Sequence, residues 1–305
     1  MFNFPIVNSI FLKSFLIFGG GIAIAYIAVC LFYFWTQKKF IFKPQAEVVA
    51  TPIDVGIPYE EFWLPVSSAN NRREKIHGWW CPQEEEEEEE EAGVVLYLHG
   101  CKGNMAAQEE SWNLDRVAKL YSLGFSVLTI DYRGYGRSEG RFPTEARVYE
   151  DVETTWRYLI REKQVPPEKI FVYGHSLGGA IAVHLCQQHP EAAGLVVESC
   201  PSSMIDAARQ RWYRIFPLDS IVHQKFDSIS KIKNIKMPIL FIHGGSDRCV
   251  PVKMSEKLFE ATSAPKQLLL IPDAEHDNAC QLGGDRILAT LGEFFRKNSN
   301  CEENH

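Results

Sequence analysis

Uncharged, mostly apolar residues run without a break near the N-terminus of the chain. No charged residue occurs from Ser14 to Gln37. The 21 residues from Phe15 to Trp35 would span about 31 Å as a helix, enough to cross the hydrocarbon core of a bilayer. The run ends in four aromatic residues, 32–35, a composition typical of a membrane interface. The pattern predicts a membrane anchor in residues 1–43, with one transmembrane helix at about 15–35.

Two other interpretations of this run are a cleaved signal peptide and a buried core helix. The run is longer than the apolar region of a signal peptide, and no clear small-residue cleavage site follows it. A core helix is disfavoured because the run is far along the chain from the predicted strands. One lysine precedes the run (Lys13) and three follow it (Lys38, Lys39 and Lys43), so the positive-inside rule puts the remaining chain on the cytoplasmic side.

From residue 58 onward the pattern changes to short apolar strands separated by helical periodicities. Two runs around a polar turn at 67–73 predict an edge hairpin, at 60–66 and 75–81. Other apolar runs predict strands at 93–98, 169–173, 194–197, 238–243 and 267–271. Helical spacing predicts helices at 145–162 and 177–188. This alternation predicts an α/β fold with a mostly parallel central sheet and helices on both faces, in a domain of residues 58–297 followed by a tail at 298–305.

Residues 199–236 connect two predicted strands and are rich in aromatic side chains, among them Trp212, Tyr213, Phe216 and Phe226. We expect this connection to form a small cap over the functional site. Its aromatic content suits an acyl-chain or other apolar substrate. The same residues could instead only pack the cap onto the sheet, and a cap must do both.

The segment FVYGHSLGGA combines a predicted strand, a tight turn and a predicted helix around Gly174-His175-Ser176-Leu177-Gly178. This is the sequence form of a nucleophile elbow, in which a serine sits on a strained corner at the carboxyl edge of a sheet. The glycines leave room for the corner and for close approach of the helix to the strand. An ordinary strand–turn–helix of an α/β sheet is the alternative.

A serine nucleophile needs a base and an acid, which in this arrangement follow it in the order acid, then histidine. His276 lies just past the strand predicted at 267–271, where a base can be held on a loop. Asp247 lies on the loop after the preceding strand and is the expected acid. Asp247 could instead be a turn or helix-cap residue before 252–261. The rival acids Asp273 and Asp277 are too close to His276 in sequence to come from a separate loop.

A reversed order of partners, His99, Asp131 and Ser176, is rejected because His99 precedes a loop that suits another role. The strand at 93–98 runs into His99-Gly100-Cys101, where backbone N–H groups could stabilise an oxyanion. We predict that the amides of Cys101 and Leu177 form this oxyanion hole. The Cys101 side chain is interpreted as a packing residue rather than as a second nucleophile.

Five segments occur in one order: LHGCKGN, DYRGYGRSEG, GHSLGG, HGGSDRCVP and AEHDN. Together they resemble the α/β-hydrolase superfamily over roughly residues 58–297, and in detail the membrane-anchored abhydrolase-domain serine hydrolases, a group that includes protein depalmitoylases. The resemblance implies the same roles for Ser176, Asp247, His276 and the amides of Cys101 and Leu177. It implies a structural role for the DYRGYGRSEG run. Cys101-Lys102 departs from these relatives, which usually have a small residue and Asn there.

Composition limits the number of domains and the kinds of partner, but it does not indicate a function. The 305 residues, 46% of them apolar, suffice for one sizeable core and an anchor. Glu84–Glu91 is a run of eight glutamates, predicted to be a solvated loop; a docking site for a cation or basic protein is the alternative. Because the run carries −8 of a net −7, the rest of the chain is at +1 and its charge indicates no partner. The chain has no basic stripe, so no nucleic-acid partner is expected.

The eight cysteines show no CxxC or zinc spacing, and no Asn-x-Ser/Thr sequon occurs, which together fit a reducing compartment. We therefore expect no metal and no organic cofactor. The predicted function is hydrolysis of esters or thioesters of acyl lipids or acylated proteins by a membrane-anchored serine hydrolase. The oligomeric state is left open.

Two alternatives to this function stay open at this point. One is a serine aminopeptidase or amidase, which would need an acidic cap residue to pair with a substrate amine. Candidates for it are Asp206, Asp219 and Asp227. The other is a non-catalytic membrane scaffold, against which the complete triad in the correct order argues.

Overall fold

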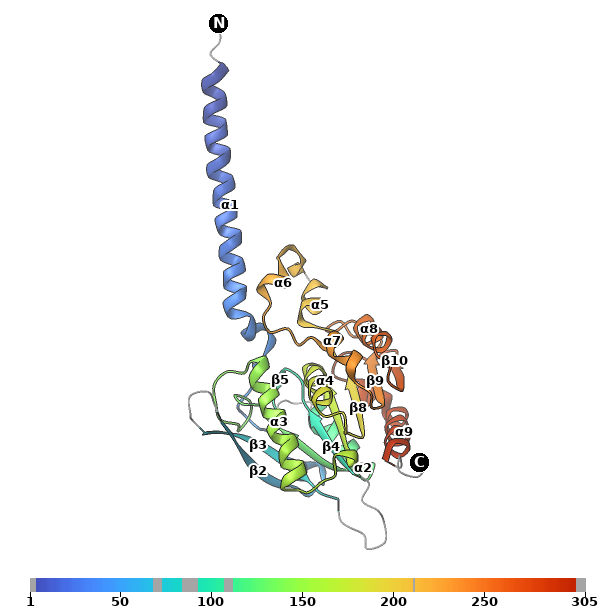
Figure 1. Cartoon of the computed structure of the whole chain (residues 1–305). Coiled ribbons are helices and arrows are strands. Elements are labelled where there is room, and N and C mark those ends of the chain that lie inside the picture. The colour runs from blue at the N-terminus through green and yellow to red at the C-terminus, as the bar shows by residue number, and fades with distance from the viewer. Residues whose placement is uncertain (1–3, 68–72, 84–92, 107–111, 211, 300–305) are drawn as a thin grey trace.

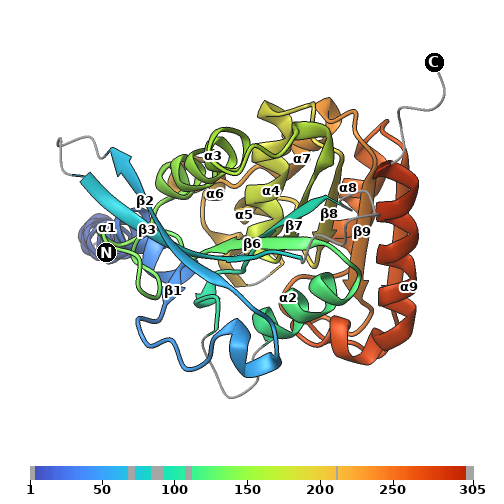
Figure 2. The same cartoon turned by 90° about the horizontal axis from the view of Figure 1, so that it is seen from below.

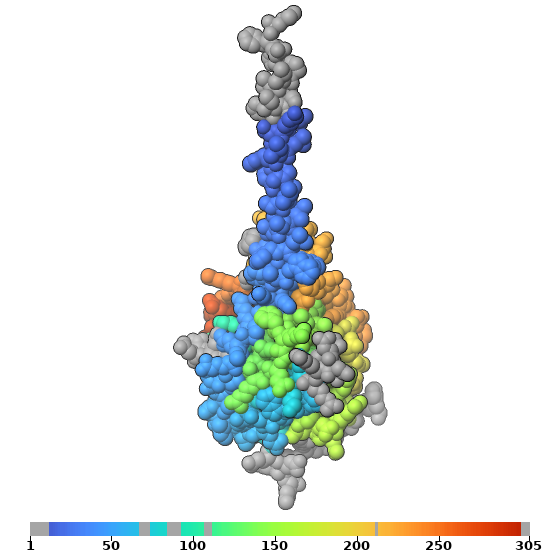
Figure 3. Space-filling model, turned by 90° about the vertical axis from the view of Figure 1, so that its left-hand side faces the viewer, coloured from blue at the N-terminus to red at the C-terminus, as the bar shows by residue number. Residues whose placement is uncertain are grey.

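A long helix and a rounded domain make up the computed structural model, which describes residues 4–67, 73–83, 93–106, 112–210 and 212–299 (Figure 1). The helix, α1 (Phe4–Ile41), stands clear of the domain for much of its length and meets it near its C-terminal end (Figure 3). The stretch Leu12–Ile41 is long and apolar enough to cross a membrane, with a mean hydropathy of 2.4 over 18 residues. None of that apolar window is buried in the protein.

Eight strands form one twisted sheet in the order β10-β9-β8-β7-β4-β6-β3-β2. Neighbouring strands are parallel except around β3, which runs antiparallel to β6 and to β2. The strands are β2 (Glu60–Ser67), β3 (Arg73–Cys81), β4 (Val94–Leu98), β6 (Ser126–Ile130), β7 (Ile170–His175), β8 (Gly194–Glu198), β9 (Ile239–Gly244) and β10 (Lys266–Ile271). Every residue of β4 and β6–β9 is buried, which explains why these strands read as continuous apolar runs rather than as alternating ones.

Helices cover both faces of the sheet (Figure 2). One face is covered by α3 (Glu145–Arg161), α4 (Leu177–Gln188), α7 (Ser228–Lys231) and α8 (Lys253–Ala261), and the other by α2 (Trp112–Ser122) and α9 (Ala279–Ser299). Short 3-10 turns, η1 (Pro52–Val55) and η2 (Pro167–Lys169), lie between these elements. In α3, the hydroxyl of Thr144 caps the first turn, and an apolar stripe that includes Val148 and Trp156 faces the core. The domain core thus consists of two apolar layers with the sheet between them.

The end of α1 is tied into the domain. Phe42 is only 1% exposed and packs edge-on against Phe142 and Phe226. The next two residues form β1 (Lys43–Pro44), which pairs in parallel with β5 (Lys102–Gly103). The Lys43 N–H donates a 2.9 Å hydrogen bond to the carbonyl of Cys101. Helix α1 is therefore joined, within two residues of its end, to the loop that follows β4.

Between β8 and β9 the chain leaves the sheet and forms a cap segment, residues 201–222. Its elements are α5 (Met204–Arg209), η3 (Trp212–Ile215) and α6 (Leu218–Ile221), which lie beside the domain-proximal part of α1 (Figure 1). The chain then returns to the core through α7 and η4 (Ile232–Asn234), where Phe226 and Ile232 are fully buried. The first half of the 199–236 connection is therefore the part that stands over the sheet.

The predicted fold class is confirmed: a mostly parallel sheet carries helices on both faces. The predicted hairpin corresponds to β2 and β3, and the helices predicted at 145–162 and 177–188 correspond to α3 and α4. The strand before the elbow extends to His175 rather than ending at 173. The Glu84–Glu91 run and most of the hairpin turn, 68–72, lie outside the described residues.

Gly136 offers a test of the close packing around the buried side chain of Asp131, which follows β6. Its φ is +49°, and a Cβ there would overlap the buried carboxylate of Asp131. We expect Gly136→Ala to lower the free energy of unfolding by about 1–2 kcal/mol for the backbone and a further 1–3 kcal/mol for the overlap. Thermal unfolding of the full chain in detergent measures this cost.

Gly124→Ala is the matched control, because Gly124 also has a positive φ (+87°) but has no atom within 4 Å of a built Cβ. It should show only the backbone cost of about 1–2 kcal/mol. Equal losses in the two variants would contradict this account of Gly136.

Candidate active site

Ser176 occupies the corner between β7 and α4. Its backbone has φ +55° and ψ −120°, a conformation that costs a serine about 1–3 kcal/mol. Glycines make the corner possible, since a Cβ on Gly178 would overlap the carbonyl of Leu98 and one on Gly174 would overlap Gly178. The Ser176 N–H donates to the carbonyl of Glu198 at 2.8 Å, which holds the turn against β8. The serine side chain is thereby held at the carboxyl edge of the sheet.

Asp247 and His276 reach this corner from two loops at the same edge, after β9 and β10. His276 Nε2 lies 2.8 Å from Ser176 Oγ, and His276 Nδ1 lies 2.7 Å from Asp247 Oδ2. The two loops are bonded to each other, because the Gly245 N–H donates to Ile271 O (2.8 Å) and the Ser246 N–H to Ala274 O (2.9 Å). These backbone hydrogen bonds between the two loops fix the positions of Asp247 and His276 relative to each other.

The Asp247 carboxyl has a pKa well below its ordinary value. Burial would raise this pKa, but hydrogen bonds from His243, His276 and the backbone N–H of Val250 stabilise the carboxylate more strongly. An ionised carboxylate can only accept, so Nδ1 of His276 carries the ring proton and Nε2 accepts from the Ser176 hydroxyl. The arrangement can take a proton from Ser176 as its oxygen attacks an electrophile.

The loop after β4 lies directly against the serine. A Cβ on Gly100 would be 3.2 Å from the Cβ of Ser176, so the backbone of this loop passes close to the corner. Cys101 and Leu177, the two predicted sources of oxyanion amides, line the same cavity as Ser176. Burial raises the pKa of the Cys101 thiol to about 11, which keeps it protonated at neutral pH and disfavours it as a nucleophile.

Two tyrosines from the DYRGYGRSEG run support this loop. The hydroxyl of Tyr132 donates to the carbonyl of His99 at 2.9 Å, and that of Tyr135 donates to the carbonyl of Cys101 at 2.7 Å. Both tyrosines are fully buried. The DYRGYGRSEG run therefore holds the loop after β4 in place through these two hydrogen bonds, in agreement with the structural role expected for it.

His175, the residue before the serine, was not singled out by the sequence. It is buried, and burial together with the positive charge of Arg116 lowers its pKa to about 4, so the ring is neutral. Its Nε2 lies 3.1 Å from the carbonyl oxygen of His276. Because a carbonyl only accepts, His175 donates to it and helps to fix the loop that carries His276.

A buried ion pair holds the same loop from the other side. Arg116 makes two hydrogen bonds to the Glu198 carboxylate, at 2.7 and 2.6 Å, and donates to the carbonyl of Asp277 at 3.1 Å. The hydroxyl of Tyr173 also donates to Glu198, at 2.7 Å. Burial alone would raise the pKa of Glu198, but Arg116 lowers it to about 2. An acidic residue ending an apolar strand is visible in the sequence, whereas its partner 82 residues away is not.

The other acids weighed from the sequence lie elsewhere. Asp131 is fully buried, where it accepts from the Met105 N–H at 2.8 Å and lies 3.5 Å from His99 Nε2. Asp277 is half exposed and lies 3.8 Å from His175, and Asp273 is exposed. Asp247 also accepts from the N–H groups of Cys249 and Val250, so its turn role coexists with its contact to His276.

A cavity of about 440 Å³ opens at Ser176. Its walls come from three parts of the chain: the loops beside Ser176, the cap segment and the C-terminal end of α1. Most of the lining is apolar, and the polar side chains include Gln37, Lys39 and Lys43. This volume falls within the range of ligand pockets, about 300–1,000 Å³. The contribution of α1 to the cavity wall was not predicted from the sequence.

Metal binding would compete with this arrangement. Among the described residues, His175, His276 and Asp277 could place one ligand atom each within 4.8 Å of one another. Both ring nitrogens of His276 already face Asp247 and Ser176. A cation on this cluster would therefore take His276 away from one of them.

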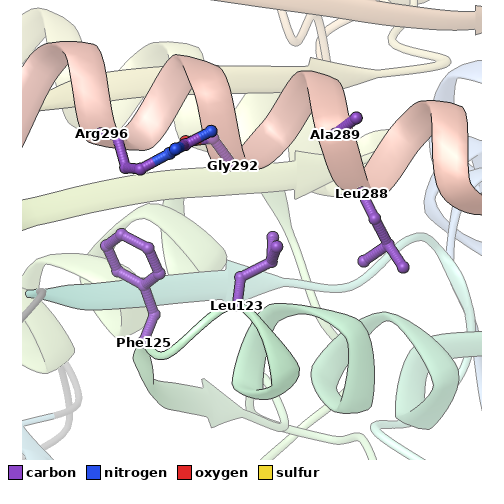
Figure 4. A pocket seen from close by; sticks show the side chains of 6 residues that line it. All are labelled: Leu123, Phe125, Leu288, Ala289, Gly292 and Arg296. Atoms are coloured by element: carbon purple, nitrogen blue, oxygen red, sulfur yellow. The ribbon is translucent and has the colours of Figure 1, made fainter.

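A second hollow, of about 280 Å³, lies between α9 and the segment that joins α2 to β6 (Figure 4). Its lining residues are Leu123, Phe125, Leu288, Ala289, Gly292 and Arg296. The Arg296 guanidinium is bonded to the carbonyl of Gly292. None of these lining residues is a nucleophile or a general base, so the cavity at Ser176 is the candidate site.

Comparisons with known proteins point to one family. Residues 89–227 match the family model described as "Serine aminopeptidase, S33". An uncharacterised protein of Mycobacterium tuberculosis is 35% identical over 195 residues, which cover 64% of this chain and 68% of that protein. The α/β-hydrolase domain-containing protein WAV2 of Arabidopsis thaliana is 25% identical over 299 residues, 91% of this chain and 92% of WAV2. The solved esterase Pf2001 of Pyrococcus furiosus has the same fold, with a TM-score of 0.67 at 23% identity, covering 85% of this chain and 98% of that one.

Glu198→Gln tests the buried ion pair. The change leaves Arg116 buried without a counter-charge, and we expect a loss of about 3–5 kcal/mol in the free energy of unfolding. Because the pKa of Glu198 is lowered from 4.5 to about 2 by folding, its stabilising effect is complete above pH 4.5 and is lost as the pH falls towards 2. The difference in unfolding free energy between wild type and variant should narrow over that window.

Glu191→Gln is the surface control, since Glu191 is half exposed and pairs with His189. Its cost should be below about 1 kcal/mol. A pH-independent gap between wild type and Glu198→Gln would show that the Glu198 pKa is not lowered by folding.

Proposed function

Because this chain belongs to the α/β-hydrolase superfamily, we propose that it is a serine hydrolase that cleaves carboxylic esters or thioesters. One observation carries the proposal: Ser176 Oγ lies 2.8 Å from a histidine whose other nitrogen lies 2.7 Å from a buried carboxylate. Ser176 is also a lining residue of a cavity whose walls are mostly apolar side chains. Activation of the serine and binding of an acyl group therefore meet at one place.

The reaction proceeds through an acyl-enzyme. His276 Nε2 takes the hydroxyl proton while Ser176 Oγ attacks the carbonyl carbon, and the carbonyl oxygen becomes an oxyanion that accepts from the amides of Cys101 and Leu177. Protonated His276, oriented by ionised Asp247, then gives its proton to the leaving alcohol or thiol. In the second half, water loses a proton to His276 and attacks the acyl carbon. The acid leaves, and Ser176 regains its proton.

We further propose that the protein is anchored in a membrane through α1, with the catalytic domain on the cytoplasmic side, and that its substrates are acyl lipids or acylated proteins. The length and hydropathy of Leu12–Ile41 support the anchor. The lysine excess behind this segment supports the orientation. The apolar cavity between α1 and the cap segment supports an acyl substrate.

An aminopeptidase is the second candidate, because the matching family model carries that description. The acidic cap residues that it would need are engaged elsewhere: Asp206 pairs with Lys257, Asp219 pairs with Arg209, and Asp227 caps α7. The lining residues of the cavity include two lysines and no carboxylate. These two lysines would repel a positively charged substrate amine, which favours an ester or thioester substrate.

Labelling by a fluorophosphonate probe tests the proposal. The wild-type chain, reconstituted in vesicles, should react, and Ser176→Ala should lose the label completely while retaining the same melting temperature. A well-folded wild type that does not react would refute the serine-hydrolase proposal and favour the non-catalytic scaffold. Competition by long-chain esters and thioesters, but not by peptide amines, would separate the acyl hydrolase from the aminopeptidase.

Asp247→Asn addresses the acid. An amide in place of the carboxylate no longer selects the imidazole tautomer that accepts from Ser176, so kcat should fall by about 10⁴-fold. Asp273→Asn is the matched control on the neighbouring loop, where Asp273 is exposed, and it should keep full activity. Hydrolysis of a short p-nitrophenyl ester measures both, and a larger loss in Asp273→Asn than in Asp247→Asn would reverse the assignment.

A further inference from the structure

The end of the cap segment and the two residues that follow it are bonded to α1 at the level where the helix reaches the domain. Gln37 is 8% exposed, and its side-chain oxygen accepts from the backbone N–H groups of His223 (2.9 Å) and Gln224 (3.0 Å). Its amide nitrogen donates to the carbonyl of Ile221 at 2.8 Å. These bonds fix the height of the cap segment along α1.

A second set of contacts lies farther up the helix, towards its N-terminus. The hydroxyl of Tyr26 donates to the carbonyl of Ile215 at 2.9 Å, and the Tyr26 ring stacks on Phe216 at 5.7 Å between centroids. Tyr33 contacts Tyr213 and Phe216 at 5.5 and 5.4 Å. The turn of residues 213–216, here termed the cap tip, therefore reaches about three helical turns beyond Gln37.

The position of Tyr26 gives the depth of the cap tip relative to a membrane. The uncharged part of α1 ends at Gln37, and the expected span ends at Trp35. Tyr26 lies nine residues before Trp35, which is about 14 Å along a helix. A hydrocarbon core is about 30 Å thick, so the Tyr26–Ile215 contact lies well inside the leaflet nearer to the domain.

The chemistry of the cap tip suits that depth. Ile215 is 64% exposed, although it is a large apolar side chain. In a hydrocarbon environment its carbonyl would need a partner within the protein, and the Tyr26 hydroxyl provides one. Arg214, which is exposed beside it, is the only charged residue among residues 213–216.

The cavity at Ser176 extends to the aromatic contacts between α1 and the cap tip. Tyr33, Tyr213 and Phe216, which join the helix to the cap tip, are themselves lining residues of the cavity. One continuous hollow therefore connects the nucleophile to a point beside α1 within the expected bilayer. Figure 3 shows the cap against the domain-proximal part of the helix.

Building on the proposed function, we infer that the cap tip inserts into the leaflet beside α1 and that substrates reach Ser176 from that leaflet. The acyl chain enters the cavity beside the packed rings of Tyr33, Tyr213 and Phe216, so it moves from hydrocarbon to cavity without crossing water. The substrate class is then a long acyl chain that already lies in the same leaflet, joined by an ester to a lipid or by a thioester to a protein.

Ile215→Asp in the full chain tests the inference, because a carboxylate on the cap tip resists insertion. Leu282→Asp is the matched control: Leu282 is 58% exposed, lies on α9 and is remote from α1. Both variants are reconstituted in phosphatidylcholine vesicles. Each is assayed on a water-soluble butyrate ester, on a palmitoyl glyceride within the vesicle, and on a vesicle-bound S-palmitoyl peptide.

We expect Ile215→Asp to lower kcat/KM for whichever palmitoyl substrate the wild type cleaves by at least about tenfold, and to keep butyrate hydrolysis and fluorophosphonate labelling within about twofold. Leu282→Asp should change neither. The palmitoyl substrate that the wild type prefers distinguishes a lipid from an acylated protein as the source of the chain.

Equal effects of Ile215→Asp on palmitoyl and butyrate substrates, or no effect on either, would overturn the inference. So would a wild type that cleaves butyrate but neither palmitoyl substrate. Failure of the wild type to label or to cleave butyrate would instead refute the proposed function, so the two failures are distinct.

Discussion

The backbone of Ser176 is the constraint around which the site is arranged. A serine at φ +55° is stable only where its surroundings compensate for the strain, and here the compensation comes from close packing. Gly174 and Gly178 let β7, α4 and the loop after β4 approach within distances that no side chain would permit. The same approach brings the backbone of Gly100 against the serine. The strained corner and the position of the predicted oxyanion loop thus have one physical cause.

The loop that carries His276 is held in place by two buried side chains, those of His175 and Arg116. Two successive carbonyls of this loop, those of His276 and Asp277, accept from the side chains of His175 and Arg116. Arg116 can lie buried there because Glu198 neutralises it with two hydrogen bonds. The position of the imidazole therefore depends on an ion pair that never contacts it, and on strands β7 and β8 that carry His175 and Glu198.

Much of this arrangement could be predicted from local pattern. The strand, glycine turn and helix around Ser176 are contiguous in sequence, as are the strand-end loops of Asp247 and His276, so short-range rules apply to them. The partnership of Arg116 with Glu198 and the bonds of Tyr132 and Tyr135 to the loop after β4 could not be found that way. They join segments that only the fold brings together, and a buried arginine looks like any other charged helix residue in sequence.

α1 was predicted as an element separate from the domain, and the local sequence pattern is least informative for this helix. Its apolar composition indicates a candidate membrane span, but it does not show that Gln37 bonds Ile221 of the cap segment or that Tyr33 and Phe40 line the cavity. Nothing in the periodicity of residues 15–35 distinguishes a helix that is only connected to the domain from one that also lines its cavity. The distinction comes from tertiary contacts with residues nearly two hundred positions away.

The pairing of β1 with β5 makes the helix and the domain a single mechanical unit. Directly after the buried Phe42, the backbone N–H groups of Lys43 and Gln45 donate hydrogen bonds to the loop beside Ser176. A flexible linker would let the domain turn freely relative to α1, whereas this junction fixes the angle between the helix and the domain. Proteolytic cleavage after the helix would therefore leave the domain without part of its cavity wall.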